Sequence, residues 1–168
     1  MIFKFLNRSF YISFSIVALT YFLDRFTKIY VIQLDKNNLG SDIFNSAYLN
    51  ITLIWNKGIA FGLFSFTEAY LYNFLSLIIS IIIIILLVMS FNSPSFKKYS
   101  LLMIVGGALG NLYDRIFINA VPDFIDFHVG DFHWFVFNVA DIFISIGVIL
   151  MIFFEIIDNN RININDKN

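Results

Sequence analysis

Four long apolar segments dominate this sequence and limit what the chain can fold into. They lie at about residues 10–34, 69–91, 99–118 and 138–157, and each is long enough to cross a bilayer as a helix, which takes roughly 20 mostly apolar residues. Hydrophobic residues make up 59% of the chain, and the mean hydropathy is +0.79. A soluble domain of this length could not bury so much apolar surface. The sequence therefore predicts an all-α membrane protein with four transmembrane helices and a single domain covering residues 1–168.

The distribution of Lys and Arg outside these segments predicts how the chain is oriented. Six basic residues flank one side of the membrane and two flank the other. The six are Lys4, Arg8, Lys97, Lys98, Arg161 and Lys167, and the two are Lys36 and Lys57. By the positive-inside rule, we expect both termini in the cytoplasm and the loops 35–68 and 119–137 on the outer side.

The N-terminal segment has some features of a cleaved secretory signal, since basic residues precede an apolar run. No small-residue cleavage site follows, however. Asp24, Arg25 and Lys28 come instead, and the apolar character then resumes. We therefore expect an uncleaved first membrane helix.

The first outer loop contains a pattern that is typical of a β-hairpin. Apolar and polar residues alternate over 48–53, the turn Asn56–Gly58 follows, and residues 59–64 resume an extended apolar run. We expect a small hairpin or sheet that lies on the outer membrane surface. An aromatic-rich interfacial loop without a sheet is the alternative.

Charged side chains interrupt three of the four segments at a common depth. A helical rise places Asp24 roughly 21 Å along the first segment and Asp114 roughly 22 Å along the third. Both of these segments run outward, whereas the fourth begins at the outer face with Asn138 and Asp141 in its first turn. The topology therefore predicts that these groups meet in the outer third of the bilayer.

Residue spacing predicts which of these side chains share a helix face. Asp24 and Lys28 are four residues apart, which favours a structural ion pair. Asn111, Asp114 and Arg115 share one face of the third helix, and the small residues of 106–110 allow a neighbouring helix to approach it closely. Each group alone could serve packing, and Asp141 could simply cap its helix. Together, at one depth, they indicate a functional site, because isolated charges in lipid cost several kcal/mol each.

Composition limits the chemistry that such a site can perform. The chain has no cysteine and only two histidines, which excludes thiol catalysis and leaves little for histidine-based catalysis. Two carboxylates held close together share one proton, so such a pair can both activate a water and protonate a leaving group. The candidate acids near the outer face are Asp114, Asp123, Asp126, Asp131 and Asp141. Asp114 is the poorest choice because Arg115 would hold it ionised, and Asp123 with Asp141 is the preferred pair.

Other interpretations of these residues are open at this point. His128 and His133 with Asp126 and Asp131 could bind a metal, but their spacing matches no familiar ligand pattern, so we expect no metal and an interfacial aromatic belt instead. A buried ion relay of a small transporter is a second possibility, although the second helix offers no polar path. A purely structural assembly protein is a third. A net charge of −1 predicts no nucleic-acid partner.

Five motifs in this order resemble bacterial lipoprotein signal peptidase, also called signal peptidase II, a four-helix intramembrane aspartyl protease. The motifs are FLDRFTK, WNKGIAFG, GGALGNLYDRI, VPDFIDF and FNVADI. The resemblance covers about residues 10–157. One departure is Pro122, where members of the family usually have a branched apolar residue.

The resemblance implies a function and assigns roles to residues. It implies that Asp123 and Asp141 are the catalytic pair and that Asp24 and Lys28 are the first-helix ion pair. Residues that would bind substrate or support the pair are Asn56, Gly58, Asn111, Asp114, Arg115 and Asn138. It further implies a monomer in the bacterial inner membrane that needs no cofactor and contacts membrane lipids. The substrate would be a prolipoprotein, cut just before a cysteine that carries a diacylglyceryl group.

Overall fold

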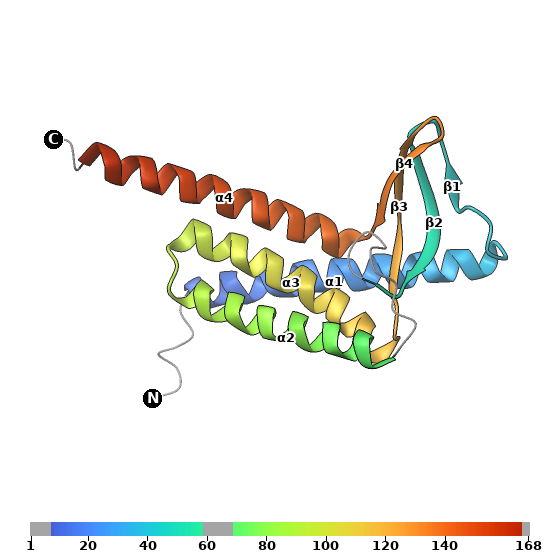
Figure 1. Ribbon diagram of the computed structural model, residues 1–168, viewed down its shortest axis with the longest axis horizontal. Coiled ribbons are helices and arrows are strands. Elements are labelled where there is room, and N and C mark those ends of the chain that lie inside the picture. Colours follow the sequence, from blue (N-terminus) through green and yellow to red (C-terminus); the bar gives the residue numbers. More distant parts are fainter. Residues whose placement is uncertain (1–7, 59–68, 166–168) are drawn as a thin grey trace.

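The computed structural model describes residues 8–58 and 69–165 of the chain. Its helices are α1 (Arg8–Asn37), α2 (Ala69–Phe91), α3 (Ser95–Phe117) and α4 (Val139–Asn165). Successive helices run in opposite directions, so the end of α1, the start of α2, the end of α3 and the start of α4 lie at one end of the bundle (Figure 1). All four predicted helices are present. The bounds of α2 match the prediction, whereas α4 continues to Asn165, beyond its predicted end at 157.

The outer faces of the helices are apolar. Among the described residues, two stretches are long and apolar enough to cross a membrane, Tyr72–Phe91 and Val139–Asp158. Phe26 on α1, Ile84 on α2 and Ile149 on α4 have exposed fractions of 69%, 60% and 65%. Large apolar side chains exposed along whole helices are unfavourable in water and favourable against lipid. The surface therefore fits a membrane environment.

The helix α3 occupies the centre of the bundle and contacts each of the other three helices. Glycine makes this close packing possible. A Cβ atom at Gly107 would lie 2.6 Å from the backbone oxygen of Ala140 in α4, and one at Gly110 would collide with the carboxylate of Asp24 in α1. The predicted close approach of neighbouring helices at residues 106–110 is therefore confirmed.

A four-stranded antiparallel sheet stands at the end of the bundle where α3 ends and α4 begins (Figure 1). The strands are β1 (Phe44–Asn45), β2 (Leu49–Asn56), β3 (Val121–Val129) and β4 (Phe132–Phe137), in the order β1-β2-β3-β4. The pair β2–β3 joins the segment after α1 to the segment after α3. The sheet thereby connects two parts of the chain that are distant in sequence.

The strand predicted in the first outer loop is confirmed as β2. Its predicted hairpin partner, residues 59–64, lies outside the described residues. The first outer loop supplies the antiparallel pair β1–β2, as expected of a sheet there, and β3 and β4 of the second outer loop extend this sheet, which we did not expect. The first four residues of β3 are all buried, so this strand lacks the alternation that marks a half-exposed strand.

Candidate active site

A buried cluster of charges joins α1 to α3. The Nζ atom of Lys28 donates hydrogen bonds to Asp24 Oδ2 at 2.9 Å, Asn111 Oδ1 at 2.7 Å and Asp114 Oδ2 at 2.8 Å. Arg25 Nη1 lies 2.6 Å from Asp114 Oδ1. Asp24, Lys28 and Asp114 are fully buried. Two acids and two bases make the cluster neutral, which is what permits its burial.

Arg25 is the member of this cluster whose role the sequence analysis missed. We expected Arg115 to hold Asp114 ionised, but the described side-chain contacts of Arg115 are with two backbone oxygens. Its Nη1 donates to Asn111 O at 3.1 Å and its Nη2 donates to Gly58 O at 3.3 Å. The missed signal was the position of Arg25, directly after one buried charge and three residues before another.

Asn111 connects the charge cluster to α4. Its Oδ1 accepts from Lys28, which leaves its amide nitrogen free to donate, and Nδ2 donates to Asp141 Oδ1 at 2.9 Å. The side chain of Asp141 is therefore held by an amide whose orientation is itself determined by a buried lysine.

The first turn of α4 positions Asp141 through a reciprocal pair of hydrogen bonds. The backbone N–H of Asp141 donates to Asn138 Oδ1 at 3.2 Å, and the backbone N–H of Asn138 donates to Asp141 Oδ2 at 3.1 Å. This arrangement is a capping box in which Asn138 is the N-cap. The N–H of Ala140 in the same turn donates to Asp24 Oδ1 at 3.0 Å. The hydrogen bonds that cap α4 therefore also position Asp141 in the site.

Asp123 lies at the start of β3 and reaches the same turn. It is 3% exposed. Its Oδ1 accepts from Asn138 Nδ2 at 2.6 Å, and its Oδ2 accepts from Asn56 Nδ2 at 2.8 Å. Asn138 therefore contacts both acids, Asp123 through its amide nitrogen and Asp141 through its backbone N–H.

The environment of Asp123 favours its protonated form. Burial raises its pKa, and the nearby negative charge of Asp141 raises it further, to about 6. The hydrogen bonds from Asn56 and Asn138 oppose this change because they stabilise the carboxylate, and the charge of Lys28 opposes it as well. The charge of Asp141 therefore influences the titration of Asp123, as expected for two carboxyl groups that lie near each other.

Both acids line a cavity of about 630 Å³ between the helices and the sheet. Its polar end is formed by Asn56, Asn111, Arg115, Asp123, Asn138 and Asp141. The remaining lining residues are apolar except for Ser145 and come mainly from α2 and α4, including Ile78, Ile82 and Val148. Asp114 is not among the residues that line this cavity, but Lys28 hydrogen-bonds both Asp114 and the lining residue Asn111. Gly58 supports the polar end, since its N–H donates to Asn56 Oδ1 at 2.8 Å.

The acids and histidines of the second outer loop form a separate group. Ligand atoms of Asp126, His128 and His133 lie within 4.8 Å of one another, in a group that does not include Asp131. We named these three residues with Asp131 as possible metal ligands and set them aside because their spacing matches no familiar pattern. The register of β3 with β4, which spacing alone does not show, places His133 opposite His128.

Comparison with known proteins relates this geometry to one family. The model of the family described as signal peptidase (SPase) II matches residues 16–157. A lipoprotein signal peptidase of Pelagibacter ubique is 47% identical over 161 residues, which cover 96% of each chain. A lipoprotein signal peptidase of Anaplasma phagocytophilum is 42% identical and covers 84% of this chain and 89% of its own.

Two solved structures are similar in fold to this chain. One, described as a bacterial membrane enzyme, superimposes with a TM-score of 0.73 at 30% identity and covers 89% of this chain and 90% of its own. Another with the same description has a TM-score of 0.68 at 33% identity, over 84% of this chain and 90% of its own.

Proposed function

Because this chain belongs to the signal peptidase II family, we propose that Asp123 and Asp141 are the catalytic pair with which it hydrolyses peptide bonds. The chain is an aspartic endopeptidase that removes signal peptides from prolipoproteins. The observation that carries the assignment is Asn138, a buried residue that hydrogen-bonds both carboxyl groups and holds them at one end of the cavity.

In this mechanism the two acids share one proton and bind one water between them. The ionised carboxylate takes a proton from the water as its oxygen bonds to the carbonyl carbon of the substrate. The protonated carboxyl group donates to the carbonyl oxygen. The carboxyl group that took the water's proton then passes it to the amide nitrogen as the C–N bond breaks, and a hydroxyl of the tetrahedral intermediate returns its proton to the other carboxylate. The pair returns to its singly protonated state, so atoms and charges balance.

Arg115 is well placed to bind the peptide backbone. It lines the cavity, and its Nε atom is buried without a hydrogen-bond partner among the described residues. Leaving such a donor unpaired costs free energy, and a substrate carbonyl would remove that cost. The amide nitrogen of Asn56 donates to Asp123 Oδ2, which fits the support of the pair that the sequence suggested for this residue. We therefore assign Asn56 to the support of the pair.

The shape of the cavity fits a lipidated substrate. A polar end next to the acids suits a peptide bond, and the apolar lining from α2 and α4 suits a signal helix or acyl chains. The cleaved bond would be the one just before the diacylglyceryl-modified cysteine. We propose that the chain acts as a monomer, because the two acids and the side chains that hold them form a complete site within one chain.

We also propose that all four helices cross the bacterial inner membrane with both termini in the cytoplasm. The sheet would then lie on the outer face, next to the site. Because the chain has no cysteine, single-cysteine variants test this directly. A membrane-impermeant thiol reagent applied to intact cells should label Asp131→Cys in the β3–β4 turn and leave Asn92→Cys in the α2–α3 connection unlabelled. The opposite pattern would reverse the orientation.

The catalytic assignment is tested with purified protein and a synthetic prolipoprotein, with and without the diacylglyceryl group. We expect cleavage of the lipidated form only, and its loss in Asp123→Asn and in Asp141→Asn. Asp131→Asn, which changes an exposed acid of the nearby turn, is the matched control and should cleave normally. If either Asp variant unfolds like the unmodified protein and still cleaves the lipidated substrate, that residue has no role in the mechanism.

A further inference from the structure

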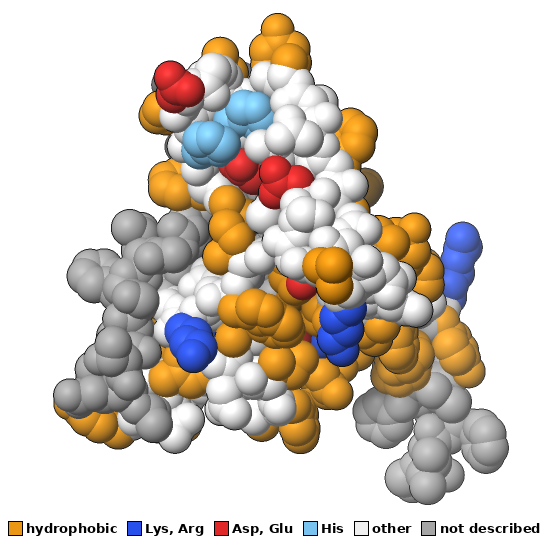
Figure 2. Space-filling view, turned by 90° about the vertical axis from the view of Figure 1, so that its right-hand side faces the viewer, with side chains coloured by type: hydrophobic (Ala, Val, Ile, Leu, Met, Phe, Trp, Pro, Cys, Tyr) orange, Lys and Arg blue, Asp and Glu red, His pale blue; other side chains and the backbone are white. Residues whose placement is uncertain are grey.

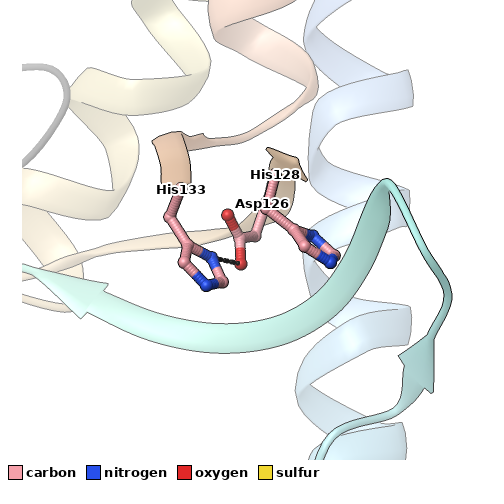
Figure 3. Close-up of side chains that lie close together, drawn as sticks. All are labelled: Asp126, His128 and His133. Carbon is pink, nitrogen blue, oxygen red and sulfur yellow. Dashed lines mark hydrogen bonds and ion pairs between the residues drawn. The ribbon is translucent and has the colours of Figure 1, made fainter. Parts of the chain in front are cut away.

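The strands β3 and β4 carry a group of potential metal ligands that is separate from the cavity. Asp126, His128 and His133 come together at one surface of the sheet, and none of them lines the cavity of the two acids. Figure 2 shows the two histidine side chains side by side at the surface, next to acidic side chains. The close-up in Figure 3 shows the carboxylate of Asp126 between the two imidazole rings.

The geometry of a β-hairpin explains why these three residues meet. Asp126 and His128 are two residues apart on β3, and alternate residues of a strand point to the same face. His133 on β4 is paired directly with His128. The two imidazole rings stack with centroids 5.0 Å apart, and His133 Nδ1 lies 2.8 Å from Asp126 Oδ2.

Two atoms of this group are buried and lack partners. Among the described residues, Asp126 Oδ1 and His128 Nδ1 have no hydrogen-bond partner, and Asp126 is only 7% exposed. A buried carboxylate oxygen and a buried imidazole nitrogen without partners are unfavourable. A bound cation would satisfy both atoms at once.

We propose that Asp126, His128 and His133 bind a divalent transition-metal ion of the zinc type. Two imidazole nitrogens and one carboxylate oxygen form a ligand set that suits zinc and its neighbours, whereas magnesium and calcium prefer oxygen ligands alone. Three protein ligands leave one coordination position open for water or for a group from another molecule.

To bind the ion, the three ligand atoms must move closer together. Ligand atoms of a tetrahedral zinc site with bonds of about 2.0–2.1 Å are about 3.3 Å apart, whereas these atoms span up to 4.8 Å. His133 can make this movement, since its side chain is 52% exposed and it follows the β3–β4 turn closely. The metal bond would replace the contact between His133 and Asp126.

By binding ligands from both strands, the ion would link β4 to β3, the strand that also carries Asp123. It would therefore stabilise the folded hairpin, because a ligand that binds only the folded state shifts the unfolding equilibrium by mass action. The site neither requires nor alters the assignment of the catalytic pair.

The test uses the full chain, purified with a tag that contains no histidine and stripped of metal. Zn²⁺ is titrated against a chromophoric chelator, and unfolding is followed with and without Zn²⁺. We expect one equivalent of Zn²⁺ to bind and the unfolding temperature to rise by about 5 °C. Mg²⁺ should cause no rise, and an equal rise with Mg²⁺ would contradict the proposed class of ion.

Matched variants identify the ligands. His133→Asn changes a largely exposed side chain and should fold normally, yet we expect it to weaken Zn²⁺ binding at least tenfold, as should Asp126→Asn. Asp131→Asn, an exposed acid outside the group, should bind Zn²⁺ like the unmodified chain. Failure of the unmodified chain to bind one equivalent, or unchanged affinity in His133→Asn, would overturn the proposal and leave the Asp126–His133 contact as a hydrogen bond only.

Discussion

Replacing Lys28 by methionine removes the centre of the buried charge cluster. Methionine has a similar length but no charge, so Asp24, Asn111 and Asp114 each lose a hydrogen bond from Nζ. Before the change the cluster has two negative and two positive charges, and afterwards it has one uncompensated negative charge in a site where both carboxylates are fully buried.

Two typical magnitudes apply to this change, and they differ widely. Removing one partner of a buried ion pair costs about 3–5 kcal/mol, whereas polar contacts between membrane helices are worth about 0.6 kcal/mol on average. The larger value applies here because the group is charged and has three partners. We therefore expect Lys28→Met to lower the free energy of unfolding by about 3–5 kcal/mol.

Unfolding in mixed micelles can be followed by circular dichroism, with Thr27→Ala as the control. The Thr27 hydroxyl bonds only to carbonyls of its own helix in the described contacts, so its loss should cost no more than about 0.5 kcal/mol. Adding Asp24→Asn to Lys28→Met restores neutrality and should recover about 1–3 kcal/mol. A cost below about 1 kcal/mol for the single variant, or no recovery in the double variant, would refute the reasoning from charge balance.

Three further changes test other contacts of the site. Asp141→Asn removes a negative charge that raises the pKa of Asp123, so this pKa should fall below about 6 in an infrared titration; an unchanged carboxyl band would show that the two acids are not coupled. The raised pKa also means that stability contributed by Asp123 is lost as pH rises through about 6, and unfolding of this variant should depend less on pH in that range. Asn138→Ala should lower the free energy of unfolding by about 1 kcal/mol through the lost cap. It should raise the activation free energy calculated from kcat by much more than that, because Asp123 also loses a donor. If both free energies change by the same small amount, Asn138 acts only as a cap. Gly110→Ala should destabilise the chain by about 1–3 kcal/mol, because its Cβ would collide with the Asp24 carboxylate, and thermal unfolding at or above the normal temperature would contradict that packing.

Much of this molecule could be predicted from local sequence. The lengths of the apolar segments predicted four helices. The rise per residue of a helix then predicted that Asp24, Asp114 and Asp141 lie at the same depth. In the structure, Asp24 contacts both α3 through Lys28 and α4 through the N–H of Ala140. The alternation over 48–53 predicted β2, since a half-exposed strand has a period of two residues.

Contacts between distant segments could not be predicted in the same way. Asp114 pairs with Arg25 rather than Arg115 because the rotation of α1 against α3 decides which cation faces the carboxylate. The strand β3 was predicted as loop because its start is wholly buried, which removes the periodic signal. The strand β4 lacks alternation for the opposite reason, because its first four residues are all exposed. The grouping of Asp126 with two histidines likewise depends on strand register.

The sequence by itself determined the helices, their approximate lengths and the level at which the acids lie, because each of these depends on contiguous residues. Only the tertiary structure decided which side chains meet, including Asn138 between Asp123 and Asp141. The physical reason is that packing among segments far apart in the chain sets helix rotation and strand register. A local sequence pattern therefore predicts neither of them.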